Sequence, residues 1–357
     1  MILPLCGEEL VIVILRSGRV IVNGGEPYIV AELNSSHNGK MEVAREMIKA
    51  AKECGCNAVK FQSWSAESLY SQDYYDQNPI SKRMVGRFSL KPLQLLELSE
   101  YCKGIGIDFS STPYSIEEVD FLIEQCNAPF IKIASMDINN IPYLNYIARK
   151  GVPIVLSTGM ASLEEIEAAI TEIEAAGNHN VCILHCVSLY PVEAQYVNLN
   201  NMVMLKERFP EYAVGYSDHT TGSEVACGAV VLGAALIEKH FTLDNKKIGW
   251  DNQMATEPAD MKELVNRCRK VHISLGGYER KLTPDEMEQR KRMRRSLVAA
   301  TDMETGHRIE PGDLTARRPG DGIPVNEYES IIGRFLTRDI KEGYMISEEH
   351  LYERKAE

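Results

Sequence analysis

Short apolar runs alternate with longer amphipathic segments from Tyr28 onward, a pattern typical of parallel strands joined by helices. Eight of these runs have the length and composition of buried strands: YIVAEL (28–33), AVKF (58–61), DFSS (108–111), FIKIAS (130–135), PIVLS (153–157), CILHC (182–186), AVGYS (213–217) and ALIEKH (235–240). Eight strand–helix units within residues 28–280 predict an α/β fold, the (β/α)8 or TIM barrel. Its active site lies at the carboxyl ends of the strands, so the residues after each strand are the first candidates for function.

Two of the segments between the strands carry clear helix signals. Residues 41–54 repeat apolar side chains at helical spacing. Residues 163–177 begin after Ser162, which has a glutamate three positions later as in a capping box, and end at Gly177. Both signals support helices that cover the barrel.

The regions outside the barrel have different patterns. Residues 1–27 form an N-terminal extension with a possible hairpin, IVILRSGRVIV, that turns at Ser17-Gly18. Residues 281–296 are rich in charge and poor in core residues, which is typical of a linker. Residues 297–357 consist of short strand candidates and turns, and they predict a small, mostly β second domain.

Composition narrows the functional classes. The chain has 39 Lys+Arg against 51 Asp+Glu, a formal charge of −12, which argues against nucleic acid or an anionic membrane as a partner. The apolar run at 10–15 is too short to span a bilayer and has no basic flank, so we expect no signal peptide and no membrane helix. Nine cysteines without a CxxC pair favour a reducing, cytoplasmic location.

Two histidines follow the last two predicted strands. His219 lies in YSDHT and His240 in EKHFT, about one strand–helix unit apart, so a barrel would direct both imidazoles into one mouth. Two neutral imidazoles suit a first-row divalent metal, with water or substrate completing the coordination. Two histidines that are simply hydrogen-bonded at the rim fit the same positions.

Two lysines end apolar strands. Lys60 in VKFQ and Lys132 in FIKIAS need an anion to offset their burial, which predicts a small substrate with phosphate and carboxylate groups. A Schiff-base lysine or a structural ion pair remains an alternative. Hydroxyl side chains after other strands would add hydrogen bonds to the anion: Ser111, Thr112, Ser135, Ser157, Thr158, Ser188 and Ser217.

Three carboxylates are expected at the same rim. Glu32 follows the first strand, Asp137 the fourth and Asp251 the eighth, and they can orient sugar hydroxyls or move protons. Each alone is equally typical of a loop cap or a salt bridge. Gln62 and Tyr190 are neutral hydrogen-bonding candidates at this level.

In the second domain, Arg317 and Arg318 precede a Pro-Gly-Asp-Gly turn. Arginine suits bidentate recognition of oxygens, but two arginines before a turn are more often a solvated surface. The residues alone favour the surface.

The ordered motifs resemble those of the sialic acid synthases, the N-acetylneuraminate synthase family, in its bacterial form. They are AELNSSHNG, VKFQ, SSTPYS, KIASMDINN, LSTGM, LHCVSLYP, GYSDHT, IEKHFTLD and GWDNQMATEP. The tail, with DLTARRPGDGIP and IIGRFLTRDIKEG, is similar to the antifreeze-like (SAF) domain of that family. The resemblance runs from about Tyr28 to the C-terminus.

The resemblance implies condensation of phosphoenolpyruvate with the open-chain aldehyde of an N-acylated aminosugar, giving a 3-deoxy-2-keto acid and phosphate. It implies a divalent metal, manganese or magnesium, on His219 and His240. It places Arg318 in the active site of a partner subunit, and hence implies a domain-swapped homodimer, against the surface interpretation above. Matching positions hold phosphoenolpyruvate at Lys60, Thr112, Lys132, Ser135, Ser157, Ser188 and Ser217, and lie near sugar and metal at Glu32, Gln62, Tyr190 and Asp251.

Glu32 is our first choice for the proton-handling carboxylate, with Asp251 on the sugar hydroxyls, although the two roles are interchangeable. The chain departs from the family pattern at Asn34 and Ser36 in the first motif, at Ser188 where a relative can carry Asn, and at Trp250 and Asn252 after the eighth strand. These departures do not affect the expected type of reaction, but they leave the identity of the sugar open.

Three further functions fit the sequence beside an N-acetylneuraminate synthase acting on N-acetylmannosamine. The altered loop after the eighth strand would also suit a 6-deoxy, diacetamido sugar, as in a legionaminate synthase. A Schiff-base aldolase would also use a barrel lysine. A catalytically silent carbohydrate-binding protein would keep the fold without turnover.

Overall fold

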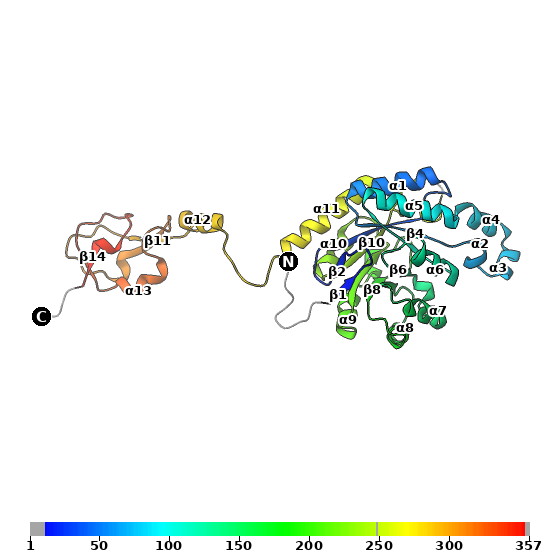
Figure 1. The fold of residues 1–357 in the computed structure, drawn as a ribbon. Coiled ribbons are helices and arrows are strands. Elements are labelled where there is room, and N and C mark those ends of the chain that lie inside the picture. The colour runs from blue at the N-terminus through cyan, green and yellow to red at the C-terminus, as the bar shows by residue number, and fades with distance from the viewer. Residues whose placement is uncertain (1–10, 248, 354–357) are drawn as a thin grey trace. The chain divides into compact units, whose positions relative to one another are not determined.

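The computed structural model describes residues 11–247 and 249–353. A parallel eight-stranded sheet forms the centre of the first of two compact units, which ends at Gly277 (Figure 1). The strand order is β5-β4-β3-β10-β9-β8-β7-β6, and a hydrogen bond from Ser110 to the carbonyl oxygen of Phe130 links the two end strands, which nearly closes the barrel. The strands are β3 (Tyr28–Asn34), β4 (Ala58–Gln62), β5 (Asp108–Thr112), β6 (Ile131–Ile133), β7 (Ile154–Ser157), β8 (Val181–Cys186), β9 (Ala213–Asp218) and β10 (Leu236–His240).

Helices surround this sheet and supply the outer wall of the core (Figure 1). They are α1 (Met41–Cys54), α5 (Pro92–Ile105), α6 (Ile116–Glu124), α7 (Ile141–Arg149), α8 (Leu163–Ala175), α9 (Asn200–Arg208), α10 (Glu224–Val231) and α11 (Pro258–Leu275). Ser162 caps α8 in a reciprocal capping box with Glu165, as the local sequence predicts. The predicted (β/α)8 barrel is confirmed.

A hairpin covers the amino ends of the strands. Strands β1 (Ile12–Ile14) and β2 (Val20–Val22) pair antiparallel, with Gly18 in the left-handed conformation at the turn. Val13, Leu15 and Ile21 pack against apolar side chains from the lower part of the barrel. The hairpin therefore extends the apolar core at the amino ends of the strands. Residues 1–10 of the predicted extension lie outside the described part of the chain.

Short helices follow β4 at the carboxyl ends of the strands. They are α2 (Ala66–Leu69), α3 (Gln72–Gln77) and α4 (Pro79–Phe88). Trp64, Tyr75, Val85 and Phe88 form a separate apolar cluster there. The edge of Trp250, from the loop after β10, contacts both Trp64 and Phe88. An aromatic group therefore borders the mouth of the barrel.

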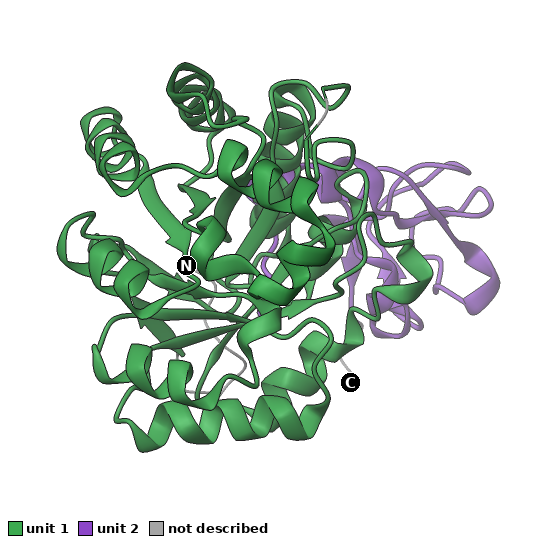
Figure 2. Cartoon of the chain, turned by 90° about the vertical axis from the view of Figure 1, so that its right-hand side faces the viewer, with its two compact units in different colours: residues 1–277 green, residues 278–357 purple. Residues whose placement is uncertain are grey.

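A second compact unit begins at Tyr278 (Figure 2). It has its own apolar core. Its antiparallel pairs are β11–β12 and β13–β14, so the predicted small C-terminal β domain is confirmed. The charged segment 281–296, which the sequence predicts as a linker, lies within this unit and contains a helix. The elements are α12 (Pro284–Met293), β11 (Ser296–Ala299), β12 (Leu314–Arg317), α13 (Tyr328–Ile331), β13 (Phe335–Leu336) and β14 (Leu351–Tyr352).

Short 3-10 turns complete the two units: η1 (Ser135–Asp137), η2 (Ala194–Tyr196), η3 (Pro311–Asp313), η4 (Val325–Glu327) and η5 (Glu348–His350). Within residues 11–247 and 249–353, no helix has the length and apolar character needed to cross a membrane.

Candidate active site

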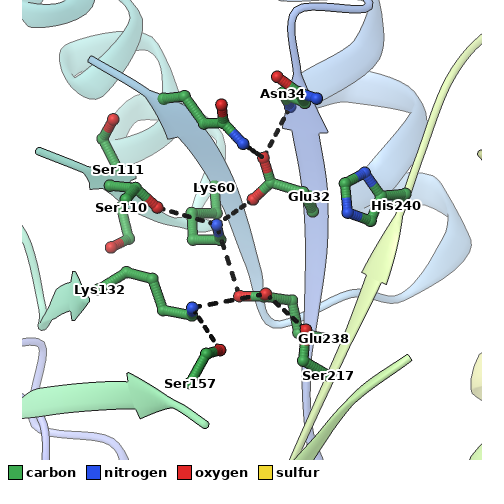
Figure 3. Close-up of polar contacts among 12 residues, drawn as sticks. Glu32, Asn34, Lys60, Ser110, Ser111, Lys132, Ser157, Ser217, Glu238 and His240 are labelled. Atoms are coloured by element: carbon green, nitrogen blue, oxygen red, sulfur yellow. Dashed lines mark hydrogen bonds and ion pairs between the residues drawn. The ribbon is translucent and has the colours of Figure 1, made fainter. Parts of the chain in front are cut away.

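Lys60 and Lys132 meet inside the barrel, and one carboxylate lies between them (Figure 3). The ammonium nitrogen of Lys60 lies 3.6 Å from Oε2 of Glu238, and that of Lys132 lies 3.9 Å from Oε1 of the same residue. Both lysines are 3% exposed and Glu238 is 4% exposed. Side chains two positions apart on a strand point to the same face of the sheet. Glu238 therefore lies on the same face of β10 as His240.

Lys60 also pairs with the second buried carboxylate, Glu32 of β3, and donates a hydrogen bond of 3.0 Å to the hydroxyl of Thr112 on β5. The register of the sheet brings these residues together. Lys60 of β4 pairs with Glu32 of β3, and Gln62, two residues after Lys60, pairs with Thr112 of β5. Three neighbouring strands therefore contribute to the surroundings of one ammonium group.

Lys132 is held by a different pair of strands. It donates a hydrogen bond of 2.6 Å to Ser157 on β7, and Ser217 on β9 donates one of 3.0 Å to Glu238. The structure thus brings together both predicted lysines and three of the predicted hydroxyl residues, Thr112, Ser157 and Ser217.

The electrostatics of this cluster follow from burial and from its four charges. Burial raises the pKa of Glu32, with the opposing pull of Lys60 offset in part by Glu238. Burial would also raise the pKa of Glu238, but Lys132 and Lys60 lower it to about 2. Burial lowers the pKa of Lys132, against the attraction of Glu238. Burial acts the same way on Lys60, but Glu238 and Glu32 together raise its pKa. Glu32 is thus the carboxyl group most easily protonated here.

The two predicted histidines lie side by side, with ring centres 5.3 Å apart. Tyr190, about half exposed, covers them with its ring centre 4.2 Å from that of His219. Nδ1 of His219 lies 2.7 Å from the carbonyl oxygen of Val187, which can only accept a hydrogen bond. In the neutral tautomer that this contact selects, Nδ1 carries the proton and Nε2 carries the lone pair.

This donor set fits a divalent metal. The ring centres of His219 and His240 are close enough for both imidazoles to hold one ion. A hydrogen bond from the second ring nitrogen to a carbonyl or carboxylate is the usual support of a histidine ligand, and Val187 supplies it for His219. His240 has Oδ2 of Asp251 at 3.2 Å from its Nδ1. Among the described residues, no three His, Cys, Asp or Glu side chains form a ready-made metal cluster.

A chain of hydrogen bonds connects Glu32 with the aromatic group at the mouth of the barrel. Gln62 donates to Oε1 of Glu32 at 3.4 Å. The amide oxygen of Gln62 accepts from the indole of Trp64 at 2.7 Å and from the hydroxyl of Tyr114 at 3.2 Å. These bonds fix the orientation of the Gln62 amide.

Ser135 and Ser188 lie together on another part of the rim. The hydroxyl of Ser135 accepts a hydrogen bond of 3.0 Å from the backbone of Gly159. A Cβ at Gly159 would come within 3 Å of both serine hydroxyls, so glycine permits this close approach. Asp137, partly buried at the end of the same short turn, accepts from Asn140 at 3.3 Å.

Arg318 is the predicted site residue that lies in the second unit, where it is exposed after β12. The other predicted residues belong to the barrel unit.

Glu238 and Asn34 are central to the geometry, and the sequence analysis gave neither a role. The sequence could have indicated Glu238, because it lies two positions before His240 on a predicted strand and its carboxylate must therefore point to the same face as that imidazole. Asn34 donates to Asp251, and this contact spans loops that are 217 residues apart in the sequence.

Comparison with known proteins agrees with this architecture. Residues 47–280 match the NeuB family and residues 294–351 match the SAF domain. The chain belongs to the NeuB family. It is similar to N,N'-diacetyllegionaminic acid synthase of Legionella pneumophila, with 37% identity over 92% of this chain and 98% of the relative. It is also similar to N-acetylneuraminate-9-phosphate synthase of Homo sapiens, with 34% identity over 92% of this chain and 94% of the relative.

Among solved structures, the chain resembles the N-acetylneuraminic acid synthetase of Leptospira borgpetersenii in complex with citrate. The TM-score is 0.72 at 31% identity, over 79% of this chain and 96% of that chain. These relatives are sugar acid synthases, and the resemblance of the motifs to the sialic acid synthase family is confirmed.

Proposed function

We propose that this member of the NeuB family is a nonulosonic acid synthase that condenses phosphoenolpyruvate with the open-chain aldehyde of an N-acylated aminosugar. The products are a 3-deoxy-2-keto acid and phosphate. The observation that carries the proposal is the group of two buried ammonium ions, Lys60 and Lys132, around Glu238 and beside paired imidazoles.

The lysine cluster suits a small, multiply charged anion. Buried ammonium groups need opposite charge and hydrogen bonds, and hydroxyl groups next to them can donate to phosphate and carboxylate oxygens. Thr112, Ser157 and Ser217 already contact the cluster. Holding the anion in line with the aldehyde is a positioning effect with a ceiling of about 7–11 kcal/mol.

The proposed reaction balances with one water molecule. The methylene carbon of phosphoenolpyruvate forms a bond to the aldehyde carbon, water adds to C2, and the tetrahedral adduct expels phosphate. Glu32, with its raised pKa, would exchange protons with the reacting oxygens. His219 and His240 would hold a divalent ion, manganese or magnesium, which when bound supplies Lewis acidity for the aldehyde oxygen.

The aminosugar would lie toward Gln62, Tyr190 and Asp251. N-acetylmannosamine, giving N-acetylneuraminate, is the default substrate. A diacetamido, 6-deoxy sugar is the second candidate, favoured by the similarity to N,N'-diacetyllegionaminic acid synthases.

The deciding experiment is a phosphate-release assay with phosphoenolpyruvate, Mn²⁺ and a panel of N-acylated aminosugars that includes both candidates. We expect release that requires both substrates. Borohydride treatment with a carbonyl substrate is the control, since the proposed reaction forms no imine. Trapping of a lysine adduct, or the absence of release with every sugar, would contradict the proposal.

We also propose that Arg318 acts in the active site of a partner subunit in a homodimer. Lys132→Ala and Arg318→Ala subunits, each inactive alone, should regain part of the activity as a mixed dimer. Verified heterodimers without activity would contradict the exchange.

A further inference from the structure

Asn34 has a backbone conformation that is unusual for a residue with a side chain. It ends β3 with φ of 41°, in the left-handed region, where the pairing with β4 shifts register between Glu32 and Asn34. Glycine and, less often, asparagine adopt this conformation. Asn34 is 7% exposed, so its amide is directed into the protein.

This conformation lets one residue contact both carboxylates that the proposed function uses. The backbone N–H of Asn34 donates a hydrogen bond of 3.0 Å to Oε1 of Glu32. Its side-chain amide donates to Oδ2 of Asp251, the same oxygen that faces Nδ1 of His240 at 3.2 Å. Within the described residues, the hydrogen bonds to the Asp251 carboxylate go to Oδ2, so Oδ1 would be able to accept one from the aminosugar under the proposed function.

A second contact joins the same two loops. The hydroxyl of Ser36 donates to the amide oxygen of Asn252, which is 1% exposed and adjacent to Asp251. Nδ2 of Asn252 has no hydrogen-bond partner among the described residues. Two consecutive residues of the loop after β10, Asp251 and Asn252, are thus bonded to the end of β3 and the loop that follows it. Of these two contacts, the one made by Asn34 reaches a carboxylate of the candidate site.

We propose that Asn34 is a positioning residue that holds the Asp251 carboxylate in place for the aminosugar, and so sets affinity for the sugar independently of phosphoenolpyruvate. The proposal rests on the proposed function. Asp251 is carried by a loop, and a loop carboxylate is ordered only by the bonds made to it. The lysine cluster is held by residues of the strands themselves, so loss of the Asn34 amide should leave it unchanged.

The test is Asn34→Gly, which keeps the left-handed backbone and the N–H to Glu32 but removes the amide. We expect KM for the aminosugar to rise on the order of tenfold, as for the loss of a hydrogen bond to a charged group, with KM for phosphoenolpyruvate within twofold of the wild type. The affinity of the unreactive open-chain alditol, measured by calorimetry, should fall by the same factor.

Asn38→Gly is the matched control. Asn38 is also left-handed, with φ of 52°, lies in the same loop and donates to the carbonyl oxygen of Ser36. This variant should keep the wild-type KM for the sugar. In an Asp251→Ala background, Asn34→Gly should change alditol affinity less than twofold, because the residue acts through Asp251.

Each outcome has a distinct meaning. Equal changes in both KM values, or the same fold-change in alditol affinity with and without Asp251, would overturn the positioning role. A wild type that releases no phosphate with any sugar would instead remove the proposed function, and this inference with it.

Discussion

Two groups of buried lysines and carboxylates lie on opposite faces of the barrel sheet, and β10 contributes to both. The inner group is Lys60 and Lys132 with Glu32 and Glu238. The outer group is the ion pair of Lys239 with Asp218, on the opposite face of β10 because Lys239 follows Glu238 directly in the strand. All six residues are at most 4% exposed, so burial does not distinguish the groups.

Both carboxylate oxygens of the outer pair accept hydrogen bonds. Asp218 accepts from Lys239 at 2.7 Å and, through Oδ1, from the backbone and hydroxyl of Thr220 at 2.8 Å and from Tyr216 at 3.2 Å. Lys239 also donates to the carbonyl oxygen of Thr220. Neither carboxylate oxygen of Asp218 is left without a donor, and the pair joins the strand ends that precede His219 and His240.

The inner group is incomplete. Within the described residues, Oε2 of Glu238 accepts no hydrogen bond and lies 3.6 Å from the ammonium nitrogen of Lys60, whereas Oε2 of Glu32 is in direct contact with that ammonium group. Buried polar atoms are normally satisfied, and exceptions concentrate where a ligand or a reaction completes them. The difference teaches that hydrogen-bond completeness, rather than burial or residue type, separates the structural group from the candidate catalytic one.

The largest expected effect on activity comes from loss of a site imidazole or of the metal that the two imidazoles would hold. His240→Ala, or treatment of the wild type with EDTA, should abolish phosphate release, because a divalent ion would lose one of two imidazole ligands or be removed. The assay is the one described above, with Mn²⁺ added back after EDTA as the control. Full activity after either treatment would remove the metal from the proposal.

The next effect separates the two groups directly. Lys132→Met removes one inner charge and should lower kcat/KM for phosphoenolpyruvate about 10³-fold, since a buried charge–charge contact to the anion is lost. The melting temperature should stay near that of the wild type, because Glu238 keeps Lys60 as a partner. A large loss of stability with intact kcat/KM would assign Lys132 to structure.

Lys239→Met should have the reverse signature. It leaves the Asp218 carboxylate buried without its charge partner, so the free energy of unfolding should fall by about 3–5 kcal/mol in urea titrations. Adding Asp218→Asn should restore much of that loss. The comparison fails if Lys239→Met has wild-type stability.

The smallest effect is on pH dependence. Burial lowers the pKa of Lys132 in the free protein, and a bound anion should raise it. Affinity for phosphoenolpyruvate should therefore be full below the free-state pKa and decline as the pH rises through the bound-state pKa. Calorimetry in two buffers of different ionisation enthalpy should detect proton uptake on binding as the pH approaches the free-state pKa. Lys132→Met should bind weakly without this uptake.

Much of the barrel was predictable because its signals are local. Each predicted strand contains most of an observed one, and the helix expected at 41–54 has those bounds. Lys60, Lys132, His219 and His240 were also recognisable, because a charged or metal-binding side chain at the end of an apolar strand is unusual wherever the strand is placed.

The partners of those residues were not predictable in the same way. Glu238 joins two lysines from β4 and β6, and Asn34 meets Asp251 across two loops. Such contacts depend on the closure of the sheet and on a shift of register at β3.

The sequence by itself thus determined the barrel, the small β domain and the kinds of side chain at the strand ends, because periodicity and local chemistry are written along the chain. Only the tertiary structure decided which buried carboxylate completes its hydrogen bonds and which does not. That distinction depends on distances between strands, and no local pattern encodes those distances.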